Sequence, residues 1–287
     1  MSLAIASAAI SSFHWQPDMQ LSIRHETLYR YSVAQAYSIE QLHLTPRAEP
    51  QQRILSWRIT TPGHCNAYSD AYGNLSHMLT LNDAHDSVRI LVEGVVATTL
   101  LHGGRLLTKE TLSPLIFTVS TRLTQPTPAL LALADATLPP RGERVSTADM
   151  LRLAAHIFGA VSYVSGATDV FSTAGESLVL GAGVCQDHAH IFLACCHAHG
   201  IPARYVSGYI DPESTGHAAS HAWVDVWIED VDFSGWVSVD VTHNRLMTDG
   251  YCRLAIGRDY ESAAPVRGMR RGGGTETMSV EALIVPI

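Results

Sequence analysis

The sequence of 287 residues lacks any concentration of positive charge. It contains 19 Lys and Arg against 27 Asp and Glu, a formal net charge of −8, and the charges are spread along the chain without long runs. Proteins that hold nucleic acid or an anionic membrane surface use a basic patch. We therefore expect neither partner, and we expect the short basic segment 267–271, beside three glycines, to form a loop.

Cysteine is scarce and irregularly spaced. The five cysteines form an odd set with no repeating interval: Cys65, Cys185, Cys195, Cys196 and Cys252. Proteins that depend on disulfides for stability are instead typically short chains with an even number of cysteines. The pattern indicates reduced thiols and predicts a cytoplasmic protein.

The start of the chain has no long hydrophobic run. Residues 3–13 are uncharged and fairly apolar, but they are too few to span a bilayer, and no Lys or Arg precedes them. We expect residues 1–20 to be a flexible extension, with a secretory signal peptide as the alternative.

Strand patterns fill residues 21–120. Segments 21–31, 53–59 and 87–96 alternate in part between apolar and polar residues and are rich in β-branched and aromatic side chains. Turn signals such as Thr-Pro-Gly at 61–63 divide them at the spacing of an antiparallel sandwich. No cluster of reactive groups stands out here, so we predict an N-terminal β domain with a scaffolding or substrate-guiding role.

Beyond this β region the hydrophobic period becomes helical. A Pro-Thr-Pro segment at 126–128 predicts a helix that runs to Leu138, and a second helix is expected to begin at Ser146 or Thr147. The change of period assigns residues 121–287 to a second, catalytic domain.

Cys185 follows a glycine-rich loop and opens an apolar, alanine-rich segment that ends at Gly200-Ile201-Pro202, a helix stop. A thiol at a helix N-terminus lies at the positive end of the backbone dipole, which favours the nucleophilic thiolate. The alternative is that this cysteine is only a small buried hydrophobe. We interpret Cys185 as the candidate nucleophile.

Three strands are predicted after this helix, at residues 203–210, 221–228 and 236–244. The last two are expected to pair as a hairpin. Such a pairing would bring His221, at the start of one strand, beside Asp240, near the end of the other.

These residues fit the chemistry of a cysteine nucleophile. An imidazole is needed as the base that later protonates the leaving amine, and a carboxylate is needed to orient the imidazole. Cys185, His221 and Asp240 supply the three roles in the order helix, strand, strand. The backbone N–H of Cys185 is expected to donate to the oxyanion.

Four motifs occur in this order along the chain. They are Gly-x-Gly-Val-Cys-Gln-Asp at 181–187, Gly-Ile-Pro-Ala-Arg-Tyr-Val-Ser-Gly-Tyr at 200–209, His-Ala-Trp-x-x-Val at 221–226 and Gly-Trp-x-x-x-Asp at 235–240. Together they closely resemble the bacterial transglutaminase-like superfamily, and segments 257–260 and 265–268 also look like that branch.

The resemblance implies an α+β fold. It consists of a papain-like transglutaminase core, in which the nucleophile helix packs on an antiparallel sheet, preceded by a β-sandwich-like domain. The resemblance also implies that Cys185 is the nucleophile, His221 the general base and acid, and Asp240 the orienting residue. Many relatives place Pro-Thr after this aspartate, whereas this chain has Val241-Thr242, so we expect a different local turn.

Potential metal ligands crowd the segment after Cys185. They are His188, His190, Cys195, Cys196, His197 and His199. On a helix, residues two positions apart point about 200° away from each other, so neither close pair of histidines can chelate one ion. We expect packing or helix-end roles and no metal site.

The sequence predicts amide chemistry through an acyl-thioester, with hydrolysis of a peptide or protein amide by a cysteine peptidase or amidase preferred and no cofactor needed. Transfer of the acyl group to a primary amine, as in a transglutaminase, is an alternative that depends on how well the cleft excludes water. A non-catalytic binding module that retains the fold is a third possibility. We expect Trp223, Gly183 and Tyr209 to line the substrate cleft.

Overall fold

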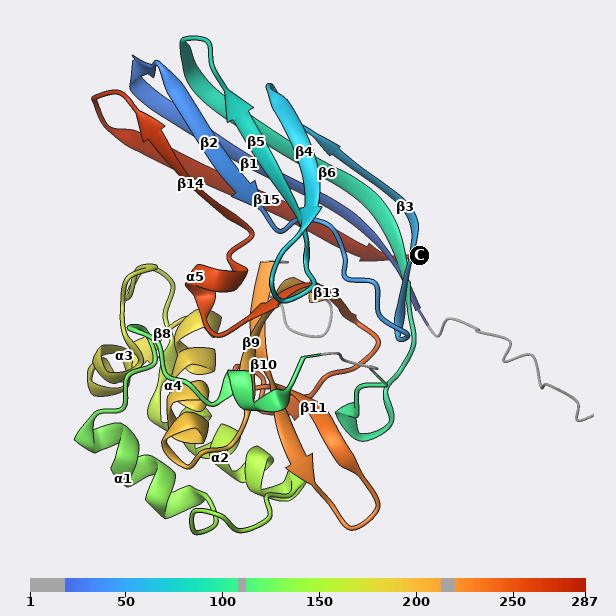
Figure 1. Ribbon diagram of the computed structural model, residues 1–287, viewed down its shortest axis with the longest axis vertical. Coiled ribbons are helices and arrows are strands. Elements are labelled where there is room, and N and C mark those ends of the chain that lie inside the picture. The colour runs from blue at the N-terminus through green and yellow to red at the C-terminus, as the bar shows by residue number, and fades with distance from the viewer. Residues whose placement is uncertain (1–18, 108–111, 213–219) are drawn as a thin grey trace, which may run out of the picture.

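The computed structural model describes residues 19–107, 112–212 and 220–287. Figure 1 shows two halves, one built of long strands and one of helices around a smaller sheet. The expected extension lies outside the described residues except for Met19 and Gln20, which begin the first strand. Within the described ranges, every helix is too short or too polar to cross a membrane.

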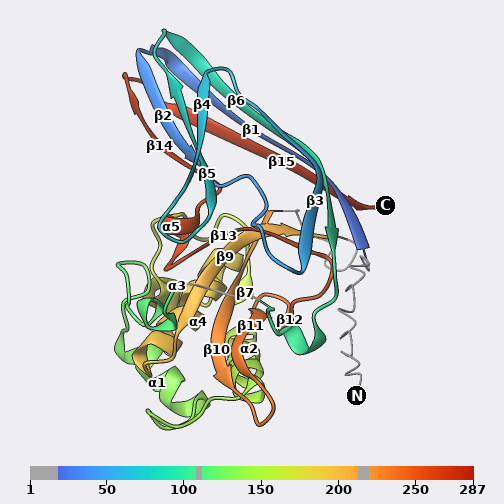
Figure 2. The ribbon, with the colours of Figure 1, turned by 45° about the vertical axis from the view of Figure 1, so that its right-hand side comes forward.

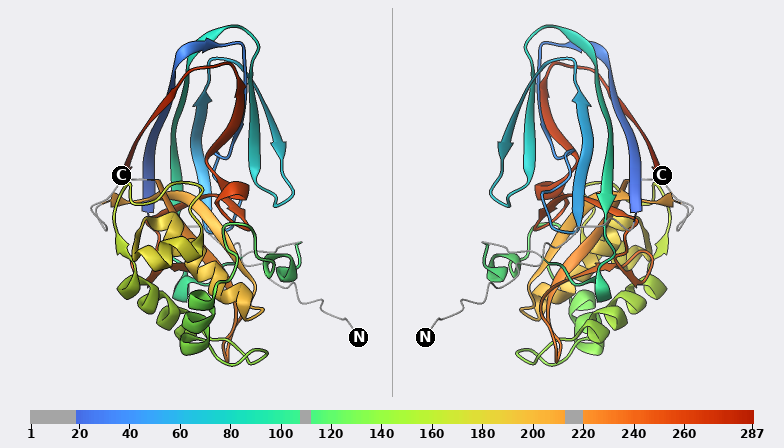
Figure 3. Two further views of the ribbon diagram at one scale, coloured as in Figure 1. Left: turned by 90° about the vertical axis from the view of Figure 1, so that its left-hand side faces the viewer. Right: turned by 90° about the vertical axis from the view of Figure 1, so that its right-hand side faces the viewer.

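The β domain contains eight long strands in two sheets. Their bounds are β1 (Met19–Gln35), β2 (Tyr37–Leu42), β3 (Gln52–Thr60), β4 (His64–Ser69), β5 (Leu75–Leu81), β6 (His85–Thr98), β14 (Val266–Arg271) and β15 (Glu276–Pro286). One antiparallel sheet has the order β15-β1-β6-β3 and the other β14-β2-β5-β4. The two sheets diverge toward the other half of the molecule (Figure 3). The predicted antiparallel β architecture is confirmed.

The predicted domain boundary needs a correction. We assigned residues 121–287 to the catalytic domain, but β14 pairs with β2 and β15 pairs with β1 over most of its length. The loop expected at 267–271 is likewise wrong, because these residues form β14. The chain therefore leaves the β domain after β6 and returns to it at the end.

The second half, called the α/β half below, is built on a five-stranded sheet. Its order is β12-β11-β10-β9-β13, with bounds β9 (Ala203–Ile210), β10 (Ser220–Glu229), β11 (Ser234–Asp240), β12 (Arg245–Leu246) and β13 (Tyr251–Gly257). The helices are α1 (Pro128–Thr137), α2 (Thr147–Ala160), α3 (Ala174–Leu180), α4 (Cys185–Ala198) and α5 (Tyr260–Ala263). Figure 2 shows α1 to α4 gathered against this sheet. Two short parallel strands, β7 (Ser162–Tyr163) and β8 (Ala182–Gly183), and two 3-10 turns, His102–Gly104 and Pro114–Phe117, complete the elements.

The helix α4 is the central element of this half, and almost all of its side chains are buried. Its start is stabilised by Asp187, whose Oδ2 accepts the backbone N–H of Val184 at 2.8 Å. It ends where Gly200 adopts a left-handed φ of 74° and Ile201 N–H bonds the carbonyl of Cys196 at 2.9 Å. The predicted helices α1, α2 and α4 are confirmed, whereas α3 lies in a segment for which the sequence predicted no element.

The predicted hairpin is also confirmed. Strands β10 and β11 pair antiparallel, with Val224 opposite Val239 and Trp227 opposite Trp236. Strand β9 pairs on the other side of β10. The start of β10 is paired with β9, where His221 lies opposite Gly208, and the pairing with β11 begins at Val224.

A buried ion network ties the two halves together. Arg253 on β13 donates to both oxygens of Asp225 on β10, at 2.9 and 2.6 Å, and to Glu49 of the β domain at 2.7 Å. Arg204 also donates to Asp225 at 2.7 Å, and Arg47 to Glu49 at 2.7 Å. Burial alone would raise the pKa of Asp225, but the charges of Arg253 and Arg204 lower it to about 2.

Removing the central cation should be costly. The substitution Arg253→Met leaves the buried carboxylates of Asp225 and Glu49 short of a partner, so we expect the free energy of unfolding to fall by roughly 3–5 kcal/mol. The milder substitution Glu49→Gln should lower the free energy of unfolding by a smaller amount. As a control, Arg144→Met removes an exposed ion pair with Glu229 and should change stability by less than about 0.5 kcal/mol. Urea unfolding measures the stability of all three variants. Equal midpoints for Arg253→Met and Arg144→Met would contradict a stabilising role of the buried ion network.

Candidate active site

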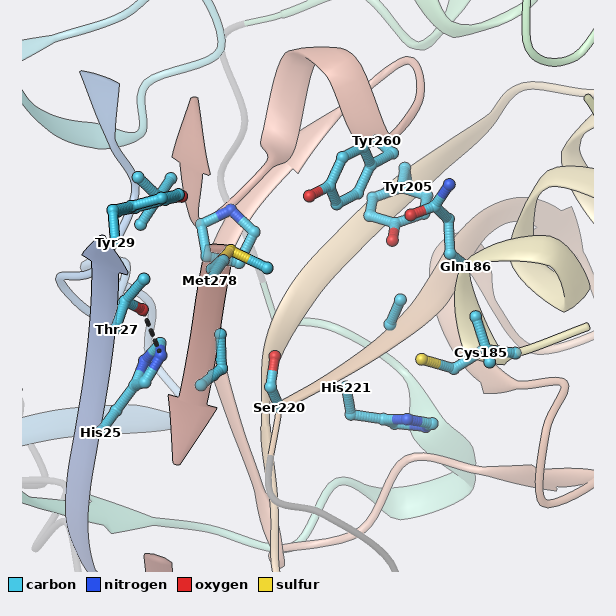
Figure 4. A pocket seen from close by; sticks show the side chains of 15 residues that line it. His25, Thr27, Tyr29, Cys185, Gln186, Tyr205, Ser220, His221, Tyr260 and Met278 are labelled. Carbon is cyan, nitrogen blue, oxygen red and sulfur yellow. Dashed lines mark hydrogen bonds between the residues drawn. The ribbon is translucent and has the colours of Figure 1, made fainter. Parts of the chain in front are cut away.

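A cavity of about 230 Å³ lies at the junction of the two halves. The α/β half lines it with Val184, Cys185, Gln186, Tyr205, His221 and Tyr260. The β domain lines it with His25, Thr27, Tyr29, Met278 and Val280. Figure 4 shows the two groups facing each other across the cavity.

Cys185 occupies the first position of α4, as predicted, and is partly exposed. Its sulfur points into the cavity (Figure 4). A backbone N–H in the first turn has no carbonyl partner within the helix, so this end of α4 favours negative charge. The nearby Asp187 does not face the cavity as a free charge, because its carboxylate also accepts the hydroxyls of Ser177 and Thr168, each at 2.6 Å.

His221 and Asp240 lie side by side, as the hairpin predicts. The Nε2–H of His221 donates to Asp240 Oδ2 at 2.9 Å, and both side chains are buried. The His221 ring lies beside the Cys185 sulfur, and both line the cavity (Figure 4). Since Nε2 is engaged by the carboxylate, Nδ1 is the ring nitrogen left for Cys185.

Asp240 accepts more hydrogen bonds than the sequence indicated. Besides His221, its Oδ2 accepts Nδ1–H of His243 at 2.7 Å and the hydroxyl of Tyr251 at 2.6 Å, and its Oδ1 accepts the backbone N–H of His243 at 3.2 Å. The turn that follows Asp240 carries Asn244 at a left-handed φ of 47°. This turn folds His243 back onto the carboxylate, a contact that sequence reasoning missed.

These contacts decide the charges of the pair. Burial of the His221 ring opposes protonation, but the charge of Asp240, its hydrogen bond and the Cys185 side chain raise the pKa of His221 from 6.5 to about 10. Burial alone would raise the pKa of Asp240, whereas the charges and hydrogen bonds of His221 and His243 hold it well below its ordinary range. The site therefore favours an imidazolium held against a carboxylate at neutral pH.

Among the described residues, one group has the composition of a metal site. Ligand atoms of His221, Asp240 and His243 lie within 4.8 Å of one another and could hold an ion. The same atoms bond each other directly, so an ion would have to replace those hydrogen bonds.

The histidines of α4 have separate partners. His188 bonds Thr242 and the Val161 carbonyl, His197 the Ala203 carbonyl, and His199 Asp135 and the Pro139 carbonyl. His190 accepts the backbone N–H of Tyr260. Each ring thus fixes a different neighbouring segment.

The three residues expected to line the cleft lie behind it. Trp223 is fully buried and donates to Ser238 Oγ at 3.0 Å, with its ring stacked on His221. Tyr209 is buried and bonds His25 Nδ1 at 2.6 Å. A side chain at Gly183 would meet the Asp187 carboxylate at 2.6 Å, so glycine is required there for the start of α4. None of the three belongs to the cavity lining.

Sequence reasoning missed the wall contributed by the β domain. The alternation of β1 places His25, Thr27 and Tyr29 on one face, which is a usable signal once the strand is known. Tyr260 belongs to segment 257–260, which resembles the bacterial branch of the family, but the resemblance implies no role for this residue. Met278 carried no signal, because β15 pairs with a strand some 250 residues earlier.

The raised pKa of His221 predicts a pH dependence of stability. A proton held more tightly in the folded state contributes fully below pH 6.5, and this contribution is lost as the pH rises to about 10. Asp240→Asn removes the charge that raises this pKa, so its free energy of unfolding should fall less across this range than that of the wild type. Urea unfolding at several pH values tests this. His156→Gln, at an exposed histidine, should keep the wild-type slope, and equal slopes for wild type and Asp240→Asn would refute the assignment.

Comparisons with known proteins agree with this architecture. Residues 137–241 match the model of the transglutaminase-like superfamily, and residues 21–97 match that of the bacterial transglutaminase-like N-terminal region. An uncharacterized protein of Mycobacterium tuberculosis is 30% identical over 273 residues, and the match covers 86% of each chain. An uncharacterized protein of Mycobacterium leprae is 28% identical over 276 residues, and that match covers 91% of this chain and 96% of the relative. A Cytophaga hutchinsonii crystal structure named "putative cysteine protease" shares the fold at a TM-score of 0.75 and 21% identity, covering 94% of this chain and 91% of that one. The chain belongs to the transglutaminase-like superfamily and carries the bacterial N-terminal region of that family.

Proposed function

We propose that this protein is a cysteine amidase or peptidase that works through an acyl-thioester on Cys185. The observation that carries the proposal is the buried His221–Asp240 pair, which lies beside a cysteine at the N-terminus of α4 in a cavity. An imidazolium next to a thiol stabilises the thiolate, and the helix end adds to this effect. In this proposal Asp240 orients His221 and balances its charge.

In the first half of the reaction, the thiolate of Cys185 attacks the amide carbonyl carbon and forms a C–S bond. The negative charge moves to the carbonyl oxygen, where the backbone N–H of Cys185 donates a hydrogen bond. The C–N bond then breaks, and the leaving nitrogen takes the proton from His221 Nδ1. An amine and a thioester result.

In the second half, water adds to the thioester carbonyl carbon while His221 Nδ1 takes one of its protons. The C–S bond breaks, the carboxylic acid leaves, and the thiolate–imidazolium pair is restored. The partial exposure of Cys185 favours water over an amine as the acceptor, because amine transfer depends on excluding water from the thioester.

The state of the thiol can be tested by alkylation. Wild-type Cys185 should react with iodoacetamide at mildly acidic pH, where an ordinary thiol is almost fully protonated. In His221→Ala the rate at that pH should fall about tenfold or more, since the stabilising cation is gone. Peptide mass spectrometry separates Cys185 from Cys65 and from the three buried cysteines. With His156→Gln as the control, equal rate–pH profiles for wild type and His221→Ala would show that Cys185 is not activated.

The fate of the acyl group can be tested directly. The protein is incubated with a peptide library, once with a primary amine and once without it. Mass spectrometry then identifies the products. We expect free acid in both incubations and none with Cys185→Ala. Amine adducts without free acid would contradict hydrolysis and would indicate transferase activity instead.

A further inference from the structure

We propose that the β domain selects the substrate: its uncharged wall, opposite Cys185, binds an acyl donor with an apolar side chain next to the scissile amide. This inference rests on the proposed function, because it assumes that Cys185 is the acylated group. It also gives the β domain a part in recognition that family membership alone does not assign.

The wall is formed by two neighbouring strands that come from opposite ends of the chain. In the register of β1 and β15, Tyr29 lies opposite Met278 and Thr27 opposite Val280. These four residues all line the cavity, and Met278 and Val280 are 58% and 45% exposed. Figure 4 shows this wall facing the side from which the Cys185 sulfur and His221 enter the cavity. Large exposed apolar side chains beside a reactive group indicate a binding surface.

The charge of the cavity decides which side chain fits. Among the described residues that line it, none is Asp, Glu, Lys or Arg. His25 is the wall residue that could carry a positive charge, but burial lowers its pKa to about 4, so it is neutral at physiological pH. A charged substrate side chain against this wall would lose its water without gaining an ionic partner from the wall, and the imidazolium of His221 on the opposite side is already paired with Asp240.

Apolar contacts are available on both sides of the entering side chain. The β domain supplies Met278, Val280 and Val266, and the α/β half supplies Val184 and Ala222. Burial, together with the charges of Glu40 and Glu276 outside the lining, raises the pKa of Tyr29, so its phenol is neutral at physiological pH. An apolar residue is thus the class that this cavity accommodates best.

The experiment uses peptidyl chloromethyl ketones that differ only in a leucine, glutamate or lysine side chain beside the reactive carbon. Their rates of Cys185 alkylation in the full-length protein are divided by their rates with free glutathione. Wild type should prefer the leucine probe by about tenfold or more over both charged probes. Met278→Arg places a cation in the wall and should lower the leucine-to-glutamate ratio about tenfold. Ser279→Arg adds the same charge on the opposite face of β15 and should leave the ratio unchanged.

The outcomes separate the two proposals. Absence of a leucine preference in wild type, or an equal change of ratio in both arginine variants, would overturn the selecting role of the wall. A lysine probe as fast as the leucine probe would do the same. Failure of the proposed function has a different signature: the rate of Cys185 alkylation by iodoacetamide would then be the same with and without the His221→Ala substitution.

Discussion

The position of the cavity depends on one buried cation, Arg253. Its guanidinium bridges Asp225 in the five-stranded sheet and Glu49 in the β domain, and all three side chains are almost completely buried. Buried charges tolerate little displacement, because each loses its compensation as soon as its partner moves. Since the cavity is lined from both halves, its shape requires this fixed junction. The network therefore contributes to the site although none of its residues lines the cavity.

Asp240 is the second fixed point, and it is fixed by hydrogen bonds rather than by packing alone. Four donors converge on its two oxygens, and Tyr251, one of them, itself accepts a bond from Arg245 at 3.0 Å. A carboxylate held in this way cannot rotate without losing several bonds at once. It can therefore keep His221 in one orientation, with Nδ1 directed toward Cys185, while the charge on the ring changes. The histidine at position 243 takes part in this fixation.

Local patterns in the sequence predicted the reactive side of the cavity well. The start of α4, the hairpin of β10 and β11 and the meeting of His221 with Asp240 all follow from short-range signals, namely glycines, alternation and spacing. The opposite wall could not be predicted in the same way. Pairing of β15 with β1 links the two ends of the chain, and no periodicity within either strand specifies its partner. The error over residues 266–287 and the omission of Met278 have this common cause.

The return of the chain to the β domain has a physical consequence for how the two halves work together. The α/β half is inserted between β6 and β14, so two separate crossings connect it to the sheets of the β domain. β15 covers the edge of β1 over eleven residue pairs, and without it the inner face of this sheet would lose Ile284, a member of its core. A bare edge of that length is a template for non-native pairing. The same strand that completes the sheet also brings Met278 and Val280 to the cavity, so the stability of the β domain and the composition of the proposed substrate wall depend on the same eleven residues.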